Sequence, residues 1–173
     1  MRTLIVMDML NGFCRANHPL SLKKSSAETE KYISAKIEDT FRDGGQVIFI
    51  GDSHKMSDPE INNPYPPHCM EGTEEAEIID TLKGYADKAI VLKKHTLSIL
   101  LDTGLENILK QTKPGEIEIT GLCTDICVLF AVFELRVRGY NVFVSGKGVL
   151  PLDETKQTEY LDYFKYELGA RTE

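Results

Sequence analysis

Short apolar runs alternate along the chain with longer stretches in which apolar residues recur every three or four positions. The short runs are mostly β-branched or aliphatic, which is typical of strands covered on both faces. They predict five strands, at residues 4–7, 46–50, 89–92, 116–120 and 141–144. The longer stretches predict helices at residues 26–42, 74–82, 103–111, 125–138 and 154–168. This alternation predicts an α/β fold with three α-β-α layers, in which a mostly parallel central sheet of about five to six strands carries helices on both faces.

Two segments interrupt the alternation. Residues 11–19 follow the first strand as an irregular loop, and residues 53–73 form a longer excursion with four prolines and two histidines. Long loops inside a compact domain commonly carry function, so the second excursion is a candidate for part of a site. No repeat, low-complexity tract or linker divides the sequence, and we expect residues 1–173 to form a single domain.

Composition narrows the classes of function. The 173 residues are 42% hydrophobic and 27% charged, which is typical of a globular protein. A net charge of −7, from 27 acidic and 20 basic residues, disfavours nucleic acid as a partner. The apolar runs are too short for a membrane helix, and strand-like sequence begins too early for a signal peptide. The four cysteines (14, 69, 123 and 127) form no paired framework, which favours a reducing cytoplasm.

Reactive side chains fall where the predicted strands end. Asp8 ends the first strand, Asp52 the second and Lys93 the third, while Cys127 follows the fourth. Because ligands bind beyond the carboxyl ends of parallel strands, we expect these groups to share one site.

Cys127 is the candidate nucleophile. It lies in the first turn of a predicted helix, where free backbone N–H groups favour a thiolate and can stabilise an oxyanion. A free cysteine is more often a buried core thiol, but the predicted neighbours Asp8 and Lys93 favour the catalytic interpretation. Asp8, raised in pKa by burial, would act as general base and acid, and Lys93 would keep it ionised. The adjacent Lys94 weakens the choice of Lys93.

A second group of residues resembles a metal site. Asp52 and His54 are two positions apart, so in an extended segment they point the same way, and His68 follows in the same excursion. Two histidines and a carboxylate suit one divalent metal ion, Zn²⁺ by preference, with Fe²⁺ or Mn²⁺ as alternatives. Glu60 could supply a further ligand. The alternative is a polar surface loop with two ordinary histidines.

Together these residues resemble the isochorismatase-like cysteine hydrolases, and within them the nicotinamidase/pyrazinamidase group. The resemblance spans nearly the whole chain, and its most specific segment is Gly-x-x-Thr-Asp-Ile-Cys-Val around Cys127. It implies an Asp8–Lys93–Cys127 triad. Its other anchors are residues 6–13, Asp52-Ser53-His54, Pro66-Pro67-His68 and Lys93.

The same resemblance implies roles for further residues. Asp52, His54 and His68 would bind the metal, and Glu60 matches a further ligand in some members. A cis peptide would fall at Leu122-Cys123, with the amides of Cys123 and Cys127 forming the oxyanion hole. Phe13 and Tyr65 would line the substrate pocket. The chain departs from many relatives at residues 96–99, where they read aromatic-Ser-Ala-Phe.

The resemblance implies an amidase that converts nicotinamide, and pyrazinamide with it, to the carboxylic acid and ammonia through a Cys thioester. The first alternative is a sibling hydrolase acting on another small amide or ureide. A catalytically silent binding or scaffold subunit is a second, and redox chemistry a weak third, because Cys123 and Cys127 are spaced C-x-x-x-C. We expect a small-molecule substrate and no nucleic-acid or membrane partner, and homo-oligomer formation is left open.

Overall fold

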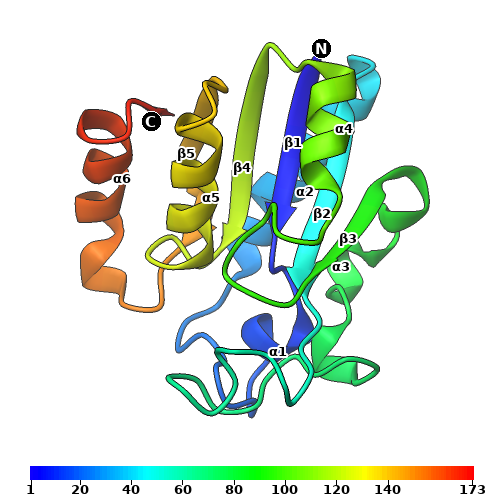
Figure 1. The fold of residues 1–173 in the computed structure, drawn as a ribbon, viewed down its shortest axis with the longest axis vertical. Helices are drawn as coiled ribbons and strands as arrows, with labels where there is room; N and C mark the ends of the chain where they lie inside the picture. Colours follow the sequence, from blue (N-terminus) through cyan, green and yellow to red (C-terminus); the bar gives the residue numbers. More distant parts are fainter.

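The centre of the molecule is a six-stranded sheet in which every neighbouring pair of strands is parallel (Figure 1). The structure, a computed structural model, describes all of residues 1–173. The strands are β1 (Arg2–Met7), β2 (Gln46–Asp52), β3 (Ile90–Lys94), β4 (Glu116–Leu122), β5 (Val142–Leu150) and β6 (Arg171–Thr172). In space they follow the order β3-β2-β1-β4-β5-β6. The strands β2 and β3 are added on one side of β1 and the last three strands on the other, so the order of strand addition reverses between β1 and β4. In sheets of this kind, ligands bind beside that switch point.

Helices cover both faces of the sheet, as the alternation predicted (Figure 1). They are α1 (Asn11–Cys14), α2 (Ala27–Arg42), α3 (Asp80–Lys83), α4 (Leu105–Thr112), α5 (Cys127–Arg136) and α6 (Gln157–Tyr166). Three short 3₁₀ turns accompany them, η1 (Glu74–Ala76), η2 (Ala86–Lys88) and η3 (Glu154–Lys156). None of these helices combines the length and the apolar character needed to cross a membrane.

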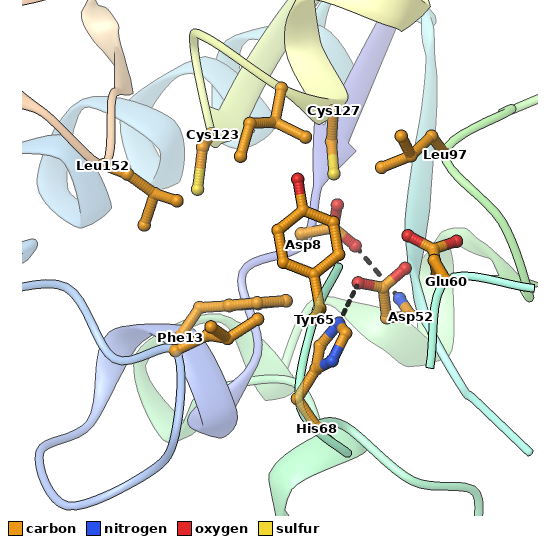
Figure 2. A pocket seen from close by; sticks show the side chains of 12 residues that line it. Asp8, Phe13, Asp52, Glu60, Tyr65, His68, Leu97, Cys123, Cys127 and Leu152 are labelled. Carbon is orange, nitrogen blue, oxygen red and sulfur yellow. Dashed lines mark hydrogen bonds and ion pairs between the residues drawn. The ribbon is translucent and has the colours of Figure 1, made fainter. Parts of the chain in front are cut away.

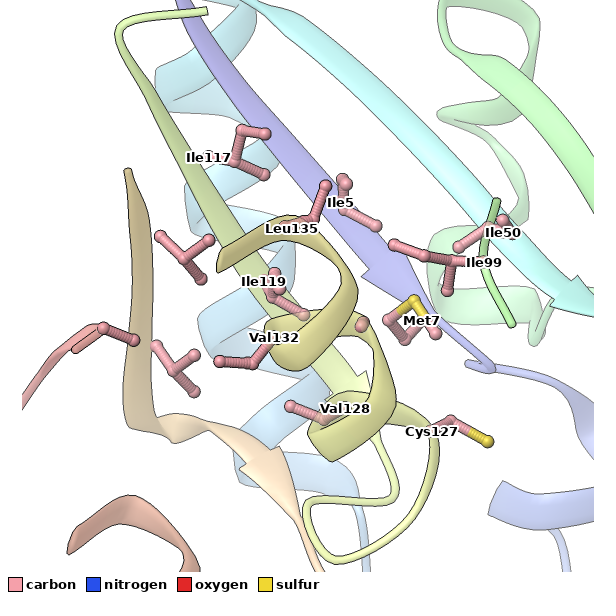
Figure 3. Close-up of a cluster of buried hydrophobic side chains, with 14 of the residues drawn as sticks. Ile5, Met7, Ile50, Ile99, Ile117, Ile119, Cys127, Val128, Val132 and Leu135 are labelled. Atoms are coloured by element: carbon pink, nitrogen blue, oxygen red, sulfur yellow. The ribbon is translucent and has the colours of Figure 1, made fainter. Parts of the chain in front are cut away.

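Two hydrophobic cores lie on the two sides of the sheet, because successive residues of a strand point to opposite faces. On one side Ile5 and Met7 of β1 pack in a 19-residue cluster with α4, α5 and α6 (Figure 3). On the other side Leu4 and Val6 pack in a 14-residue cluster with α2 and α3. Burial on both faces explains why β1 and most of β2 read as continuous apolar runs.

Four of the five predicted strands are confirmed to within two residues, and the fifth, predicted over 141–144, continues to Leu150. The strand β6 is an addition of two residues that no pattern marked. The helix predicted over 74–82 is wrong. This segment contains only η1 and the single turn α3, because Ile78 and Ile79 are drawn out to pair with the chain after β1. Ile78 forms an antiparallel bridge with Leu10, and the Ile79 N–H donates to the Met9 carbonyl (3.1 Å). The loop predicted to begin at residue 11 opens instead with the one-turn helix α1.

One glycine controls how closely the ends of β1 and β4 approach. Gly121 has a φ of +105°, and a Cβ atom there would lie 1.9 Å from the carbonyl oxygen of Met7. Only glycine fits both the backbone conformation and the contact. Gly121 therefore lets the residues that follow β1 meet the turn that follows β4.

Candidate active site

Asp8 lies directly after β1, at the sheet edge where the predicted residues meet. It is 1% exposed and has a φ of +50°, a conformation that a non-glycine residue rarely adopts without a local reason. The N–H of Asp52, at the end of β2, donates to one of its oxygens (3.0 Å). Burial, and then the nearby Asp52 carboxylate, raise the pKa of Asp8 to about 6. Such a carboxyl group can both take and return a proton near neutral pH.

The amine of the site belongs to Lys94, which corrects the assignment to Lys93. The Lys94 side chain is fully buried, and its Nζ lies 3.1 Å from Asp8 Oδ2 and also contacts Asp52 Oδ1. Lys93 is exposed and lies beside a different cavity, on the other face of the sheet. The reason is register: Lys94 pairs with Asp52 at the ends of β3 and β2, whereas Lys93 pairs with Gly51. A shift of one residue along a strand turns a side chain to the opposite face.

Lys94 remains charged although it is buried. Burial opposes its charge, but the two carboxylates outweigh that effect and hold its pKa well above the usual value. Its Nζ lies 3.7 Å from the sulfur of Cys127, so one cation contacts Asp8, Asp52 and the candidate nucleophile.

Cys127 is the first residue of α5 and faces the cavity at the end of the sheet (Figure 2). Burial raises the pKa of its thiol well above the usual value, and the charge of Lys94 only partly offsets this. The expectation that the helix start favours a resting thiolate is therefore not met. A neutral thiol needs a base when it attacks, and the Asp8 carboxylate, which contacts the same Lys94 Nζ as the sulfur, is placed to be that base.

The turn between β4 and α5 presents two backbone donors. The Leu122-Cys123 peptide bond is cis, as the resemblance implied. The N–H groups of Cys123 and Cys127 have no acceptor among the protein's hydrogen bonds, whereas the Ile126 and Val128 N–H groups both donate to the Cys123 carbonyl (3.0 Å each). Two free donors beside a nucleophile are suited to stabilise an oxyanion.

Asp52, His54 and His68 come together as a buried cluster, with ligand atoms all within 4.8 Å of one another. His54 Nε2 lies 3.4 Å and His68 Nε2 3.6 Å from the Asp52 carboxylate. Glu60 is not part of this cluster, but lies in the wall of the neighbouring cavity. The structure thus brings Asp52, His54 and His68 together as predicted, and Glu60 lines the cavity beside them.

Contacts around the cluster orient both imidazoles. His68 Nδ1 donates to the carbonyl oxygen of Pro66 (2.8 Å), and His54 Nδ1 donates to the Asp58 carboxylate (3.1 Å). Because each Nδ1 carries the ring proton, each Nε2 has a free lone pair, and both Nε2 atoms lie near Asp52. His54 Nε2 is buried without a hydrogen-bond partner. This pattern of histidine supported by a carboxylate or carbonyl is common around protein metals, so the residues fit a divalent ion. Asp58 was missed in the sequence, although its position four residues after His54 was a usable signal.

A cavity lined by 12 residues opens beside these groups. Figure 2 shows Cys123 and Cys127 at the top of the view, Tyr65 in the centre, His68 at the bottom, Phe13 at the lower left, and Asp52 and Glu60 at the right. Both aromatic residues line the cavity as predicted. The remaining apolar wall includes Leu97, from the stretch 96–99 that the resemblance places beside the pocket, together with three residues that no motif marked, Leu20, Ile126 and Leu152.

Comparison with known proteins gives consistent matches. The model of the Isochorismatase domain family matches residues 2–172. Nicotinamidase 1 of Arabidopsis thaliana is 32% identical over 161 residues, which are 85% of this chain and 65% of that protein.

Two solved structures are similar over almost their whole length. The nicotinamidase/pyrazinamidase PncA from Bacillus subtilis has a TM-score of 0.91 at 27% identity, covering 99% of this chain and 98% of that one. The N-carbamoylsarcosine amidase from Thermoplasma acidophilum has a TM-score of 0.87 at 30% identity, covering 99% and 95%.

Proposed function

Since the chain belongs to the isochorismatase family and is a hydrolase acting on a C–N amide bond, we propose that it converts nicotinamide to nicotinate and ammonia, with pyrazinamide as a second substrate. The observation that carries this proposal is the contact of one buried lysine, Lys94, with Asp8, Asp52 and Cys127. It joins a nucleophile, a base and an Asp-His-His cluster in one cavity that is small and apolar-walled.

The reaction begins with proton transfer from Cys127 to Asp8. The sulfur attacks the carbonyl carbon of the amide as Asp8 takes the thiol proton. The carbonyl oxygen becomes an oxyanion and accepts hydrogen bonds from the N–H groups of Cys123 and Cys127. Lys94 keeps Asp8 ionised before the attack, and its charge is retained throughout.

The second half of the reaction returns the proton. Asp8 donates it to the amide nitrogen as the C–N bond breaks, and ammonia leaves a thioester on Cys127. Water then attacks the thioester carbonyl while Asp8 takes a proton from it. Collapse of that intermediate releases the carboxylic acid, and the proton on Asp8 restores the thiol.

Asp52, His54 and His68 would hold a divalent metal ion, with Zn²⁺ favoured by two nitrogen ligands and one carboxylate. When bound, such an ion supplies a Lewis acid that can accept a ring nitrogen lone pair and so orient a heteroaromatic amide. Phe13 and Tyr65 line the same cavity as Asp52, His68 and Cys127, where they would contact a flat ring.

A second candidate is hydrolysis of a small ureide, supported by the 30% identity to the N-carbamoylsarcosine amidase. The same Cys127 chemistry serves both substrates, because each presents a carbonyl carbon and an amine leaving group. The two substrates differ in the group that lies away from Cys127. Nicotinamide presents a ring nitrogen there, which suits a metal ion held by Asp52, His54 and His68, whereas N-carbamoylsarcosine presents a carboxylate.

Ammonia release across a small panel separates these candidates. Wild-type holoenzyme is assayed with nicotinamide, pyrazinamide, benzamide and N-carbamoylsarcosine, with Cys127→Ala as the matched blank. We expect turnover of nicotinamide and pyrazinamide and poor turnover of benzamide, which lacks the ring nitrogen. Turnover of the ureide alone would replace the proposal with the second candidate, and no turnover of any amide would refute both.

A further inference from the structure

The polar groups of the cavity are unusually one-sided in charge. Its wall contains three carboxylates, those of Asp8, Asp52 and Glu60, and no lysine or arginine. The one buried cation beside it, Lys94, already contacts both Asp8 and Asp52. Glu60 is therefore the carboxylate of the site that has no cation of its own within the protein.

Glu60 is held against the cavity without a partner for its side chain. It is 9% exposed, and its Oε1 is buried with no hydrogen-bond donor. The backbone fixes its place, because the Tyr65 N–H donates to the Glu60 carbonyl (3.2 Å) and the Asn62 N–H to the Tyr65 carbonyl (2.6 Å). Figure 2 shows its carboxylate near Asp52 and Leu97. Burial of an unpartnered carboxylate oxygen costs free energy, so its charge calls for a role, and the ligands that bind in the cavity are what it faces.

The sum of the formal charges in the site indicates how the charge of Glu60 affects the ligands. With Lys94 and a divalent ion present, three positive charges face the three carboxylates and the site is neutral. Without the charge of Glu60 it would carry one excess positive charge in a cavity with mostly apolar walls. Such a site would attract carboxylates, and the product of amide hydrolysis is itself a carboxylate.

We propose that Glu60 is a charge filter: its carboxylate makes the cavity selective for uncharged amides over carboxylate-bearing ligands and speeds the release of the acid product. This inference rests on the proposed function and extends it to product release. It assigns Glu60 a role in ligand selection that does not require it to bind the metal. It also disfavours N-carbamoylsarcosine, an anion, as the substrate.

The test compares two isosteric pyridines that the enzyme does not hydrolyse, the anionic nicotinate and the neutral 3-acetylpyridine. Their dissociation constants are measured by calorimetry at about pH 8, where carboxyl groups are ionised, on zinc-loaded wild type, Glu60→Gln and the control Glu71→Gln. Glu71 lies in the same excursion and its substitution changes net charge equally, but its side chain is exposed and outside the cavity.

We expect Glu60→Gln to bind nicotinate about tenfold more tightly, equivalent to about 1.4 kcal/mol, with 3-acetylpyridine and zinc content unchanged. Glu71→Gln should match wild type for both ligands. Unchanged nicotinate affinity in Glu60→Gln would overturn the inference. So would loss of zinc from this variant, which would make Glu60 a metal ligand.

Failure of the proposed function gives a different pattern. If wild type binds neither pyridine, ammonia release from N-carbamoylsarcosine and from its uncharged methyl ester decides the matter. Faster turnover of the ester retains the charge filter on a ureide hydrolase. Faster turnover of the anion, or no turnover of either, overturns the filter as well.

Discussion

Replacement of Lys94 by methionine should cost the protein both stability and activity, whereas the same change at Lys93 should cost neither. Lys94 is the only lysine or arginine in contact with Asp8 and Asp52, two buried carboxylates. Its removal leaves Asp8 with no cationic partner in a site that the chain continues to bury, and deprives Asp52 of one. Lys93 is exposed and contacts neither carboxylate, so Lys93→Met is a matched control one residue away.

The size of the effect follows from these contacts. Removal of one partner of a buried ion pair costs about 3–5 kcal/mol of unfolding free energy. For a domain of this size, each kcal/mol lowers the melting temperature by about 2–4 °C, so Lys94→Met should melt about 6–20 °C lower. Lys93→Met should stay within about 0.5 kcal/mol of wild type. Loss of the cation also raises the pKa of Asp8, because Lys94 is the group that lowers it most. We therefore expect kcat/KM at neutral pH to fall by at least about 10²-fold.

Thermal unfolding followed by circular dichroism and ammonia release measured well below the melting temperature give the two readouts. Lys94→Arg keeps the charge and should recover more stability than activity, because its guanidinium cannot place one nitrogen between both carboxylates and the sulfur. Equal losses of stability and activity in Lys93→Met and Lys94→Met would refute the assignment of Lys94 as the amine of the site. So would a fully active Lys94→Met enzyme.

Three further predictions concern the chemistry. Asp8→Asn keeps the shape but removes the base, so kcat should fall about 10²–10⁴-fold in ammonia-release assays; a near-wild-type rate would reduce Asp8 to a structural role. Because Asp8 must be ionised to accept the thiol proton, kcat/KM should decline about tenfold per pH unit below its pKa of about 6. A profile that stays flat to about pH 4 would contradict that shift. Metal removal by chelation, or His54→Ala, should collapse nicotinamide turnover but leave alkylation of Cys127 by iodoacetamide within about twofold of wild type; full turnover by folded, metal-free enzyme would remove the metal from the account.

The fold could be predicted because its strands are buried on both faces. Residues 4–7 and 47–50 are short apolar runs for the same reason that they occupy the middle of the sheet. The segment 74–82 could not be read the same way. Its apolar residues Ile78 and Ile79 mimic part of a helical stripe, but a long-range pairing with residues 9 and 10 draws them into extended chain. Tertiary contacts override a short local pattern of this kind.

The site was predictable to the level of strand ends but not to the level of one residue. Asp8, Asp52 and Cys127 follow runs whose ends are sharp in the sequence. The apolar run at 89–92 is followed by two lysines, Lys93 and Lys94, and nothing in the sequence distinguishes them. Only the pairing of β3 with β2 shows which of the two side chains turns toward the carboxylates.

The protonation state of Cys127 also lay beyond sequence reasoning. A helix start lowers the pKa of a thiol, whereas full burial beside two carboxylates raises it. Which effect wins depends on distances and burial that no spacing reveals. In this structure burial dominates and raises the pKa of the thiol, which is why the proposed mechanism has Asp8 take the proton during the attack.

The most direct test of the account is nicotinamide turnover by Cys127→Ala, measured by ammonia release beside wild type and Cys123→Ala. In the proposed mechanism Cys127 supplies the sulfur that attacks the amide, whereas Cys123 contributes only a backbone N–H, which alanine retains. We predict a loss of at least about 10³-fold for Cys127→Ala and much of the wild-type rate for Cys123→Ala. Turnover that survives in Cys127→Ala, or an equal and complete loss in both variants, would contradict the assignment of the nucleophile.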